Sequence, residues 1–339
     1  MRNLSIVFQG PAADRHGRLS PAVVRHLART RRAFPAAEII LSSWKCCPDP
    51  AWTWQGDLRP LGVRLVLSND PGALSGTISG CRYVTNLNRL MVSACAGLAA
   101  ATRPLAVKLR TDSALRNRKL VSLLAQHVLQ ESPAVPRDPA FRVFQSRVIN
   151  ASWYARDARG SLPYLYHPGD IFLAGWTEDL RLFFSAPAAG PTLFSPSSLP
   201  GLGCPWRFVP EQWFWVHAIY RATGRWVYDG NFRHAEGSVA DSEQWYLANF
   251  VPFSSRALGF SWSKYWRCYP LRGLFSVYTH VRWRRLAARY QGRRVVSLAA
   301  LGDALLTRIW RCGYRVRRRL LRLYLLRRIA LRLFVHRRE

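Results

Sequence analysis

The stretch Leu105-Ala-Val-Lys-Leu-Arg-Thr-Asp112-Ser carries the most informative chemistry of the chain. An apolar run leads directly into Arg110, Thr111 and Asp112. This pattern is typical of a buried strand that brings a carboxylate to the edge of an α/β sheet, where ligands of open sheets bind. A carboxylate there can hold a divalent cation, which prefers oxygen ligands and often bridges to phosphate. The stretch therefore favours a phosphate-bearing ligand, most simply a sugar nucleotide. The alternative is a strand followed by a polar turn, where Asp is common.

The segments around this stretch alternate between strand and helix patterns. A buried strand is expected at residues 4–8, and further strands at residues 38–42, 63–67 and 105–109. Helices are expected at residues 19–32 and 84–101. In the first helix, Ser20 would be the N-cap and Pro21 the first helical residue. This alternation predicts βαβ units around a largely parallel sheet over the first 130 residues.

The middle of the chain, residues 150–270, is rich in Trp, Tyr, Phe, Pro and Gly. A loop is expected at residues 186–205, and a helix at residues 210–221 with Pro210 in its first turn. Such a segment suits a concave site with aromatic walls. An ordinary aromatic core explains any single Trp equally well.

Length, charge and cysteine usage limit the class of protein. The chain has 339 residues, an apolar fraction of 49% and a net charge of +31, almost all from arginine. The apolar fraction argues against disorder, and the basic surface would attract polyanions. The seven cysteines include no C-x-x-C pair, which indicates free thiols in a reducing cytosol rather than a zinc site or disulfide framework. No signal peptide or spanning helix is expected, because the first apolar run is short and no stretch of 18 uncharged apolar residues occurs.

Much of the charge lies near the C-terminus. From Arg282 onward there are about eighteen arginines and two acids, Asp303 and Glu339. On a helix from Arg311 to Val335, apolar side chains would share one side, and these are Val316, Leu320, Leu323, Leu331 and Phe334. Arginines would occupy the opposite side, a combination typical of helices at an anionic membrane surface. A C-terminal helix docked on the core is the alternative.

Short motifs along the chain resemble the WavE lipopolysaccharide synthesis family. They are Ser5-Ile-Val-Phe-Gln-Gly-Pro11, Phe34-Pro-Ala-Ala-Glu-Ile-Ile-Leu-Ser-Ser-Trp44, Asp70-Pro-Gly72, Asn86-Leu-Asn-Arg-Leu-Met-Val-Ser93, Lys108-Leu-Arg-Thr-Asp112, His167-Pro-Gly-Asp-Ile-Phe-Leu-Ala-Gly175, Pro210-Glu-Gln212, Ser242-Glu243 and Ala248-Asn-Phe250. The motifs run in family order over residues 4–255. The chain departs from the expected pattern where Gly169 replaces a serine, and where Asn249 is one asparagine instead of two.

The resemblance implies an α/β fold of the GT-A glycosyltransferase type, a Rossmann-like, mostly parallel sheet flanked by helices, followed here by a basic helical C-terminal extension. It implies a glycosyltransferase domain at residues 1–275, with a donor half at 1–130 and an acceptor half at 131–275. Residues 276–339 would form the basic amphipathic tail.

On this resemblance, the nucleotide-sugar donor would contact Gln9, Gly10, Pro11, Asp70, Asn88, Arg89, Arg110 and Asp112. Asp112 ends a degenerate D-x-D and would hold Mg²⁺ or Mn²⁺, with His234 as a further candidate ligand. Arg110 or Arg89 could share the diphosphate charge, since guanidinium matches phosphate with two parallel hydrogen bonds. The alternatives are a simple turn for Gly10, a turn cap for Asp70 and a surface histidine for His234.

An inverting transfer needs a carboxylate base for the acceptor hydroxyl. Glu211 is the preferred base and Asp170 an acceptor-binding residue, and a retaining mechanism stays open. The alternatives are a helix-dipole partner for Glu211 and a turn residue for Asp170.

The function implied is sugar transfer from a nucleotide-sugar donor to a lipopolysaccharide-core or other surface-glycan acceptor. The enzyme would be cytoplasmic and peripheral at the inner membrane, held there by the tail. The rival hypothesis is a non-catalytic basic binding protein for nucleic acid or anionic membrane. The lack of recognisable nucleic-acid-binding motifs and the position of the charge in the tail weigh against nucleic acid. No G-x-x-x-x-G-K-[ST] or G-x-S-x-G sequence supports a phosphotransferase or an α/β-hydrolase.

Overall fold

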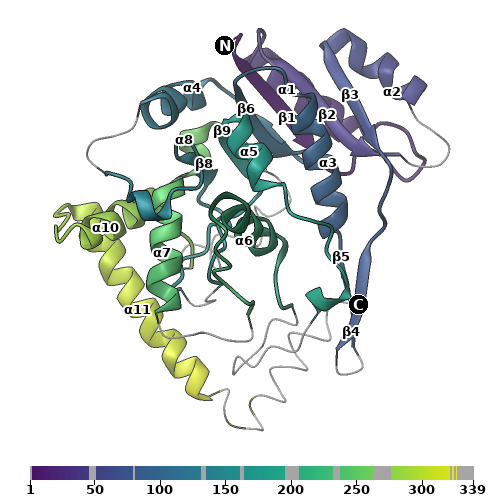
Figure 1. The fold of residues 1–339 in the computed structure, drawn as a ribbon. Coiled ribbons are helices and arrows are strands. Elements are labelled where there is room, and N and C mark those ends of the chain that lie inside the picture. The colour runs from purple at the N-terminus through teal and green to yellow at the C-terminus, as the bar shows by residue number, and fades with distance from the viewer. Residues whose placement is uncertain are drawn as a thin grey trace.

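The structure is a computed structural model that describes residues 2–45, 51–78, 81–130, 135–160, 164–194, 206–231, 237–262 and 276–320, with Leu323 and Leu326. In these segments no helix has the length and apolar character needed to cross a membrane. Figure 1 shows a central sheet with helices around it and the last helices packed along one side.

A seven-stranded sheet with the order β10-β8-β9-β6-β1-β2-β3 forms the centre of the molecule. Its strands are β1 (Leu4–Gln9), β2 (Glu38–Trp44), β3 (Val63–Ser68), β6 (Leu105–Arg110), β8 (Val148–Ala151), β9 (Phe172–Trp176) and β10 (Phe250–Phe253). Neighbouring strands are parallel except at β9, which runs antiparallel to both β6 and β8. The α/β class and the mostly parallel sheet are therefore confirmed, and all four expected strands are present.

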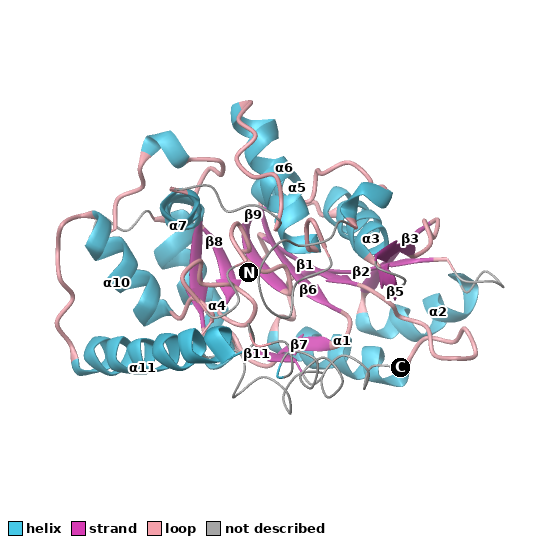
Figure 2. Ribbon diagram, turned by 90° about the horizontal axis from the view of Figure 1, so that it is seen from below, coloured by secondary structure: helices cyan, strands magenta, loops and turns pink. Residues whose placement is uncertain are grey.

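Helices cover both faces of the sheet (Figure 2). Helix α1 (Pro21–Ala33) lies on one face, and α3 (Leu87–Ala100), α5 (Thr177–Phe183) and α6 (Pro210–Thr223) lie on the other. Gly97 lets α3 approach the sheet, because a Cβ there would lie 2.5 Å from Val7 Cγ1. As expected, α1 begins after Ser20 with Pro21 at its start.

The helix expected at residues 84–101 is shorter than the sequence indicated. Residues Cys81–Thr85 form strand β5, which pairs antiparallel with β4 (Leu74–Ile78). The β-branched Val84 and Thr85 suit a strand, and the Thr85 hydroxyl accepts a hydrogen bond from the backbone N–H of Leu87. The helix therefore begins at Leu87.

Short elements complete the described fold. They are α2 (Ala51–Leu58), η1 (Arg59–Leu61), β7 (Ser113–Leu115), α4 (Lys119–Leu124), η2 (Ala125–Leu129), η3 (Pro139–Phe141), η4 (Pro191–Leu193), α7 (Ser238–Asn249), α8 (Ser255–Leu258) and β11 (Phe260–Trp262). Strands β7 and β11 pair antiparallel in a small second sheet, with Ser113 opposite Trp262.

Two helices end the described chain. Helix α10 (His280–Tyr290) buries Trp283 and Leu286 and contacts α7 and β10, and α11 (Leu298–Leu320) lies beside α10. Most of the helix expected at residues 311–335 lies outside the described residues. The division of the chain at residue 275 stays a prediction.

Candidate active site

The chain topology brings the expected donor residues to one edge of the sheet. Strands β1, β2, β3 and β6 are parallel, so their carboxyl ends meet there. Strand β8 has the same direction, because both β6 and β8 are antiparallel to β9. The segment after β8 therefore reaches the same edge. The residues just before β9, which include Asp170, reach it as well.

Asp112 lies just beyond β6 and is paired with Arg110. Arg110 Nε donates to Asp112 Oδ1 at 2.9 Å, and Nη2 donates to Oδ2 at 3.2 Å. Both side chains are about a quarter to a third exposed. The Arg110 guanidinium carbon also lies 5.7 Å from the centre of the Trp262 ring. The edge thus presents an accessible carboxylate and guanidinium beside an aromatic wall.

Gly10 brings the end of β1 close to this pair. Its φ is +133°, and a Cβ there would lie 3.1 Å from Thr111 Oγ1. The Thr111 hydroxyl donates to the backbone oxygen of Pro11 at 2.8 Å. Gln9 is buried and donates from Nε2 to Ser93 Oγ at 2.8 Å. Gln9 therefore braces the end of β1, and Gly10 lets Thr111 pack closely against it.

Asp70, just after β3, and Arg89, in the first turn of α3, form a second carboxylate–guanidinium pair. Two hydrogen bonds of 2.7 and 2.6 Å join them, and both side chains are 28% exposed. The bonds from Arg89 hold the pKa of Asp70 below its usual range. Asp70 also accepts from the Gly72 N–H, as a turn cap would. Asn88 exchanges two hydrogen bonds with the main chain of Ala189, which anchors the segment between α5 and η4 to α3.

The buried half of the site is built around Lys108, in the middle of β6. The Lys108 side chain is 0% exposed, and its Nζ donates to the backbone oxygen of Asp170 at 2.5 Å. Nζ also lies 3.4 Å from Asp170 Oδ2. Burial lowers the pKa of Lys108, and the charge of Asp170 opposes that shift. The pair fixes Asp170 at the start of β9.

Glu211 shares this electrostatic environment. Burial raises its pKa from 4.5 to about 8, and the negative charge of Asp170 contributes further, while Arg156 and Lys108 oppose the shift. Its Oε2 lies 3.6 Å from His167 Nε2, too far for a good hydrogen bond. Burial lowers the pKa of His167 to about 3, so this contact is not an ion pair at neutral pH. The two carboxylates expected to do proton chemistry are thus brought together, with Glu211 protonated in the free protein near neutral pH.

Besides the bond from Lys108 to Asp170, further hydrogen bonds hold the His167-Pro-Gly-Asp170 segment and the residue before it. Its neighbour Tyr166 donates from N to Ser242 Oγ at 2.8 Å. The backbone oxygens of His167 and Pro168 accept from Arg156 N and Asn150 Nδ2 at 2.8 and 2.6 Å. Within the described segments, His167 Nδ1 is buried without a hydrogen-bond partner. An unsatisfied buried nitrogen costs free energy and is common where a ligand or water completes a site.

Glu243 and Asn249 of the last motif hold the segments on either side of β8. Glu243 is buried and accepts from Arg159 at 2.6 and 3.0 Å and from the Tyr290 hydroxyl at 2.7 Å. Asn249 Oδ1 accepts from the backbone of Val143 and Phe144. Glu243 therefore holds Arg159 in the segment after β8, and Asn249 holds the segment before β8.

The donor set for a metal is small. In the described part of the chain, no three His, Cys, Asp or Glu side chains are grouped closely enough to hold an ion. Asp112 is the accessible carboxylate at the sheet edge, which fits a cation held mainly by phosphate oxygens. His234, the other candidate ligand, lies outside the described residues.

Sequence reasoning assigned no role to Lys108, His167, Arg156, Tyr154 or Trp262. Tyr154 contacts both Arg156 and Trp262, with its ring centre 5.6 Å from that of Trp262 and 5.5 Å from the Arg156 guanidinium carbon. The one available signal was Lys108 itself, a charged residue within an apolar strand. The aromatic contacts depend on long-range packing that no local pattern reveals.

Comparison with known proteins identifies the family. The model of the WavE lipopolysaccharide synthesis family matches residues 4–250, so the chain belongs to that family. No curated protein matches the chain.

Several solved glycosyltransferase structures resemble the chain weakly. An active-site mutant of LgtC has 13% identity and a TM-score of 0.30, covering 52% of this chain and 59% of its own. The galactosyltransferase LgtC with donor and acceptor sugar analogues has 12% identity and a TM-score of 0.33, covering 88% and 99%. GlyE of Streptococcus pneumoniae TIGR4 has 13% identity and a TM-score of 0.25, covering 51% and 34%. The chain thus spans about three fifths of the first of these proteins.

Proposed function

We propose that this protein is a glycosyltransferase of the GT-A type, which moves a sugar from a nucleoside diphosphate to a hydroxyl of a lipopolysaccharide-core or other surface-glycan acceptor. Membership in the WavE lipopolysaccharide synthesis family supports an acceptor from lipopolysaccharide synthesis. One observation carries the chemistry: β6 holds Lys108 beside Asp170 and ends in the accessible Arg110–Asp112 pair. A single strand therefore connects a phosphate-binding edge to a carboxylate cluster.

On the donor side, negative charge builds up on the departing diphosphate. In the free protein the Arg110 Nε and Nη2 donors bind Asp112; with a cation at Asp112 they would turn to the diphosphate oxygens, which their parallel geometry matches. Gly10, which has no Cβ, would let a ligand approach the backbone closely. We assign a divalent cation, Mg²⁺ or Mn²⁺, to Asp112; when bound, it would neutralise part of the diphosphate charge.

On the acceptor side, Glu211 is the base and Asp170 orients the acceptor. A base removes a hydroxyl proton most efficiently when its pKa lies near the working pH, and the pKa of Glu211, about 8, meets that condition. Asp170 is held by Lys108 and so keeps a fixed position beside Glu211.

The proposed location is the cytoplasmic surface of the inner membrane. Helix α11 exposes Leu301, Leu305, Ile309 and Val316, and arginines accompany them on the same helix. Apolar and cationic side chains on one exposed helix suit an anionic membrane surface.

The test of the catalytic proposal is a thermal-shift screen of nucleoside diphosphates with and without Mn²⁺, followed by sugar-transfer assays with the matching nucleotide sugar. One nucleotide should raise Tm by roughly several degrees at saturation, because a ligand that binds only the folded state stabilises it. If no nucleoside diphosphate or nucleotide sugar changes Tm at millimolar concentration, the proposal is wrong.

A further inference from the structure

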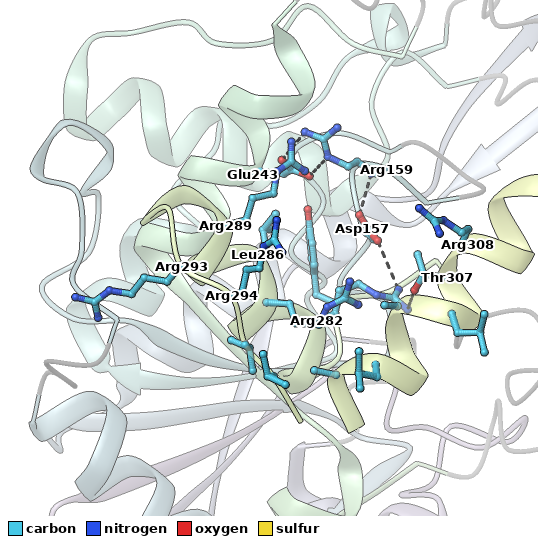
Figure 3. A pocket seen from close by; sticks show the side chains of 18 of the residues that line it. Asp157, Arg159, Glu243, Arg282, Leu286, Arg289, Arg293, Arg294, Thr307 and Arg308 are labelled. Carbon is cyan, nitrogen blue, oxygen red and sulfur yellow. Dashed lines mark hydrogen bonds and ion pairs between the residues drawn. The ribbon is translucent and has the colours of Figure 1, made fainter. Parts of the chain in front are cut away.

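A cavity of about 1250 Å³ lies between α10, the loop that follows it, and α11. Asp157 and Arg159, from the segment after β8, form its inner wall, together with Glu243 of α7. Figure 3 shows Arg282 and Thr307 close together beside Asp157, with Arg159 next to Glu243. This volume is somewhat above the roughly 300–1,000 Å³ that is usual for small-molecule sites.

Positive charge exceeds negative charge in this cavity. Its two acids, Asp157 and Glu243, are already paired with Arg282 and Arg159. Five further arginines line it without an ion pair in the described segments, and these are Arg289, Arg293, Arg294, Arg308 and Arg315. The cavity is therefore suited to an anion.

Arg282 provides a second sign of an incomplete site. It is only 7% exposed, and its Nη atoms bind the Val277 carbonyl, Asp303 and Thr307. Its Nε is buried with no hydrogen-bond partner among the described residues. Burying a guanidinium donor without a partner costs free energy, so the hydrogen bonding of this lining residue is incomplete in the described segments.

Much of the rest of the lining is aliphatic. Val296, Leu301 and Leu305 border the cavity and are 83%, 58% and 61% exposed. Tyr278 is the one aromatic residue in this lining, and it is 2% exposed. Nucleic-acid sites usually offer accessible aromatic rings for base stacking, and a free phosphate needs no aliphatic wall.

We infer that the α10–α11 cavity binds an anionic phospholipid, with the phosphate among the arginines and the start of an acyl chain against Val296, Leu301 and Leu305. Guanidinium groups bind phosphate strongly, and aliphatic side chains favour hydrocarbon over water. A lipid satisfies both parts of the cavity at once. The site is separate from the candidate active site, so its occupancy does not depend on the proposed sugar transfer.

A lipid bound in this cavity would also orient the enzyme relative to the membrane. The segment after β8 places Arg156 against the backbone of His167, while Asp157 and Arg159 line the cavity. A lipid bound there would hold the acceptor half of the enzyme near the membrane. An acceptor carried by a lipid would then reach the site from the bilayer surface.

The experiment uses the full-length protein and a soluble probe, dihexanoyl phosphatidylglycerol below its micelle concentration, with binding measured by calorimetry and no sugar nucleotide present. Arg289→Gln/Arg308→Gln removes two exposed cavity arginines, and Arg29→Gln/Arg32→Gln removes two exposed arginines of α1. We expect the cavity variant to bind about tenfold more weakly or worse, and the α1 variant to bind like the wild type.

A second matched pair tests the aliphatic wall. Leu305 lines the cavity, while its neighbour Leu306 does not, and both are exposed by more than half. Leu305→Gln should weaken phosphatidylglycerol binding, and Leu306→Gln should leave it unchanged. Equal effects within either pair would overturn the inference. So would inorganic phosphate binding as tightly as the lipid, or a single-stranded oligonucleotide competing for the same arginines.

Discussion

Lys108 Nζ donates a 2.5 Å hydrogen bond to the main-chain oxygen of Asp170 and lies 3.4 Å from its carboxylate, with the lysine side chain fully buried. This contact joins β6 to the residues just before β9. It also places the Lys108 amino group beside the Asp170 carboxylate. Burial raises the pKa of Glu211, and the charge of Asp170 adds to that shift. The pair is thus both a structural link and an electrostatic control on the proposed base.

Lys108→Met should destabilise the protein, because it leaves the Asp170 carboxylate buried without its cation. A loss of about 3 kcal/mol is expected from such a broken pair, measured by urea unfolding. Lys119→Met, at an exposed position of α4, is the control and should change stability little. Restoration of most of the stability in Lys108→Met/Asp170→Asn would show that the unpaired charge is the cause. Equal stability of the two single variants would refute this reading.

Asp170→Asn should move the acid limb of kcat/KM to lower pH. In the wild type, activity should rise with pH as Glu211 ionises around its pKa of about 8. Removing the negative charge of Asp170 lowers that pKa, whereas removing the positive charge of Lys108 raises it. The two variants should therefore shift the limb in opposite directions. If neither variant shifts the acid limb of the kcat/KM profile, Glu211 is not the base.

Glu211→Gln should separate catalysis from stability. A carboxyl whose pKa rises on folding favours the folded state at low pH and loses that contribution as pH rises from 4.5 to about 8. Glutamine cannot ionise, so Tm of the variant relative to the wild type should increase between pH 5 and pH 9, by roughly 2 °C or more. Its kcat should fall more than its donor affinity. Glu178→Gln, at an exposed position, should give a constant Tm difference.

Asp112→Asn should abolish the Mn²⁺-dependent part of nucleotide stabilisation and lower turnover by about a hundredfold or more. The folded structure should be retained, because Asp112 is partly exposed. Asp57→Asn changes an exposed acid of α2 and is the matched control. Wild-type nucleotide binding and turnover in the Asp112 variant would remove this residue from the donor site.

Gly169→Ser should destabilise the protein by about 1 kcal/mol, although the family pattern leads one to expect serine there. Gly169 has a φ of +79°, and a Cβ would lie 3.2 Å from the carbonyl carbon of Tyr154. Gly190→Ser is the control, because Gly190 has a negative φ and open space at its Cβ position. Differential scanning calorimetry of both variants measures the difference, and equal Tm values would contradict the expectation.

The sequence by itself determined the parts of the fold that depend on local pattern. Strands β1, β2 and β6 are mostly buried and β3 is half-buried, and their ends are marked by polar residues such as Asp112. Their common direction followed from the alternation with helices, so the sheet edge could be expected to collect the donor residues. The ordered motifs also pointed to the WavE family, because a series of weak matches in the right order is more specific than any one of them.

Only the tertiary structure decided what surrounds the two carboxylates. Strand β9 enters the sheet antiparallel to β6, which places Asp170 beside Lys108. Glu211 joins them from α6, and Trp262 reaches Arg110 through the pairing of β11 with β7. These contacts join residues far apart in the chain, and no local period encodes them. Burial, which raises the pKa of Glu211 and lowers that of His167, likewise exists only once the chain has packed.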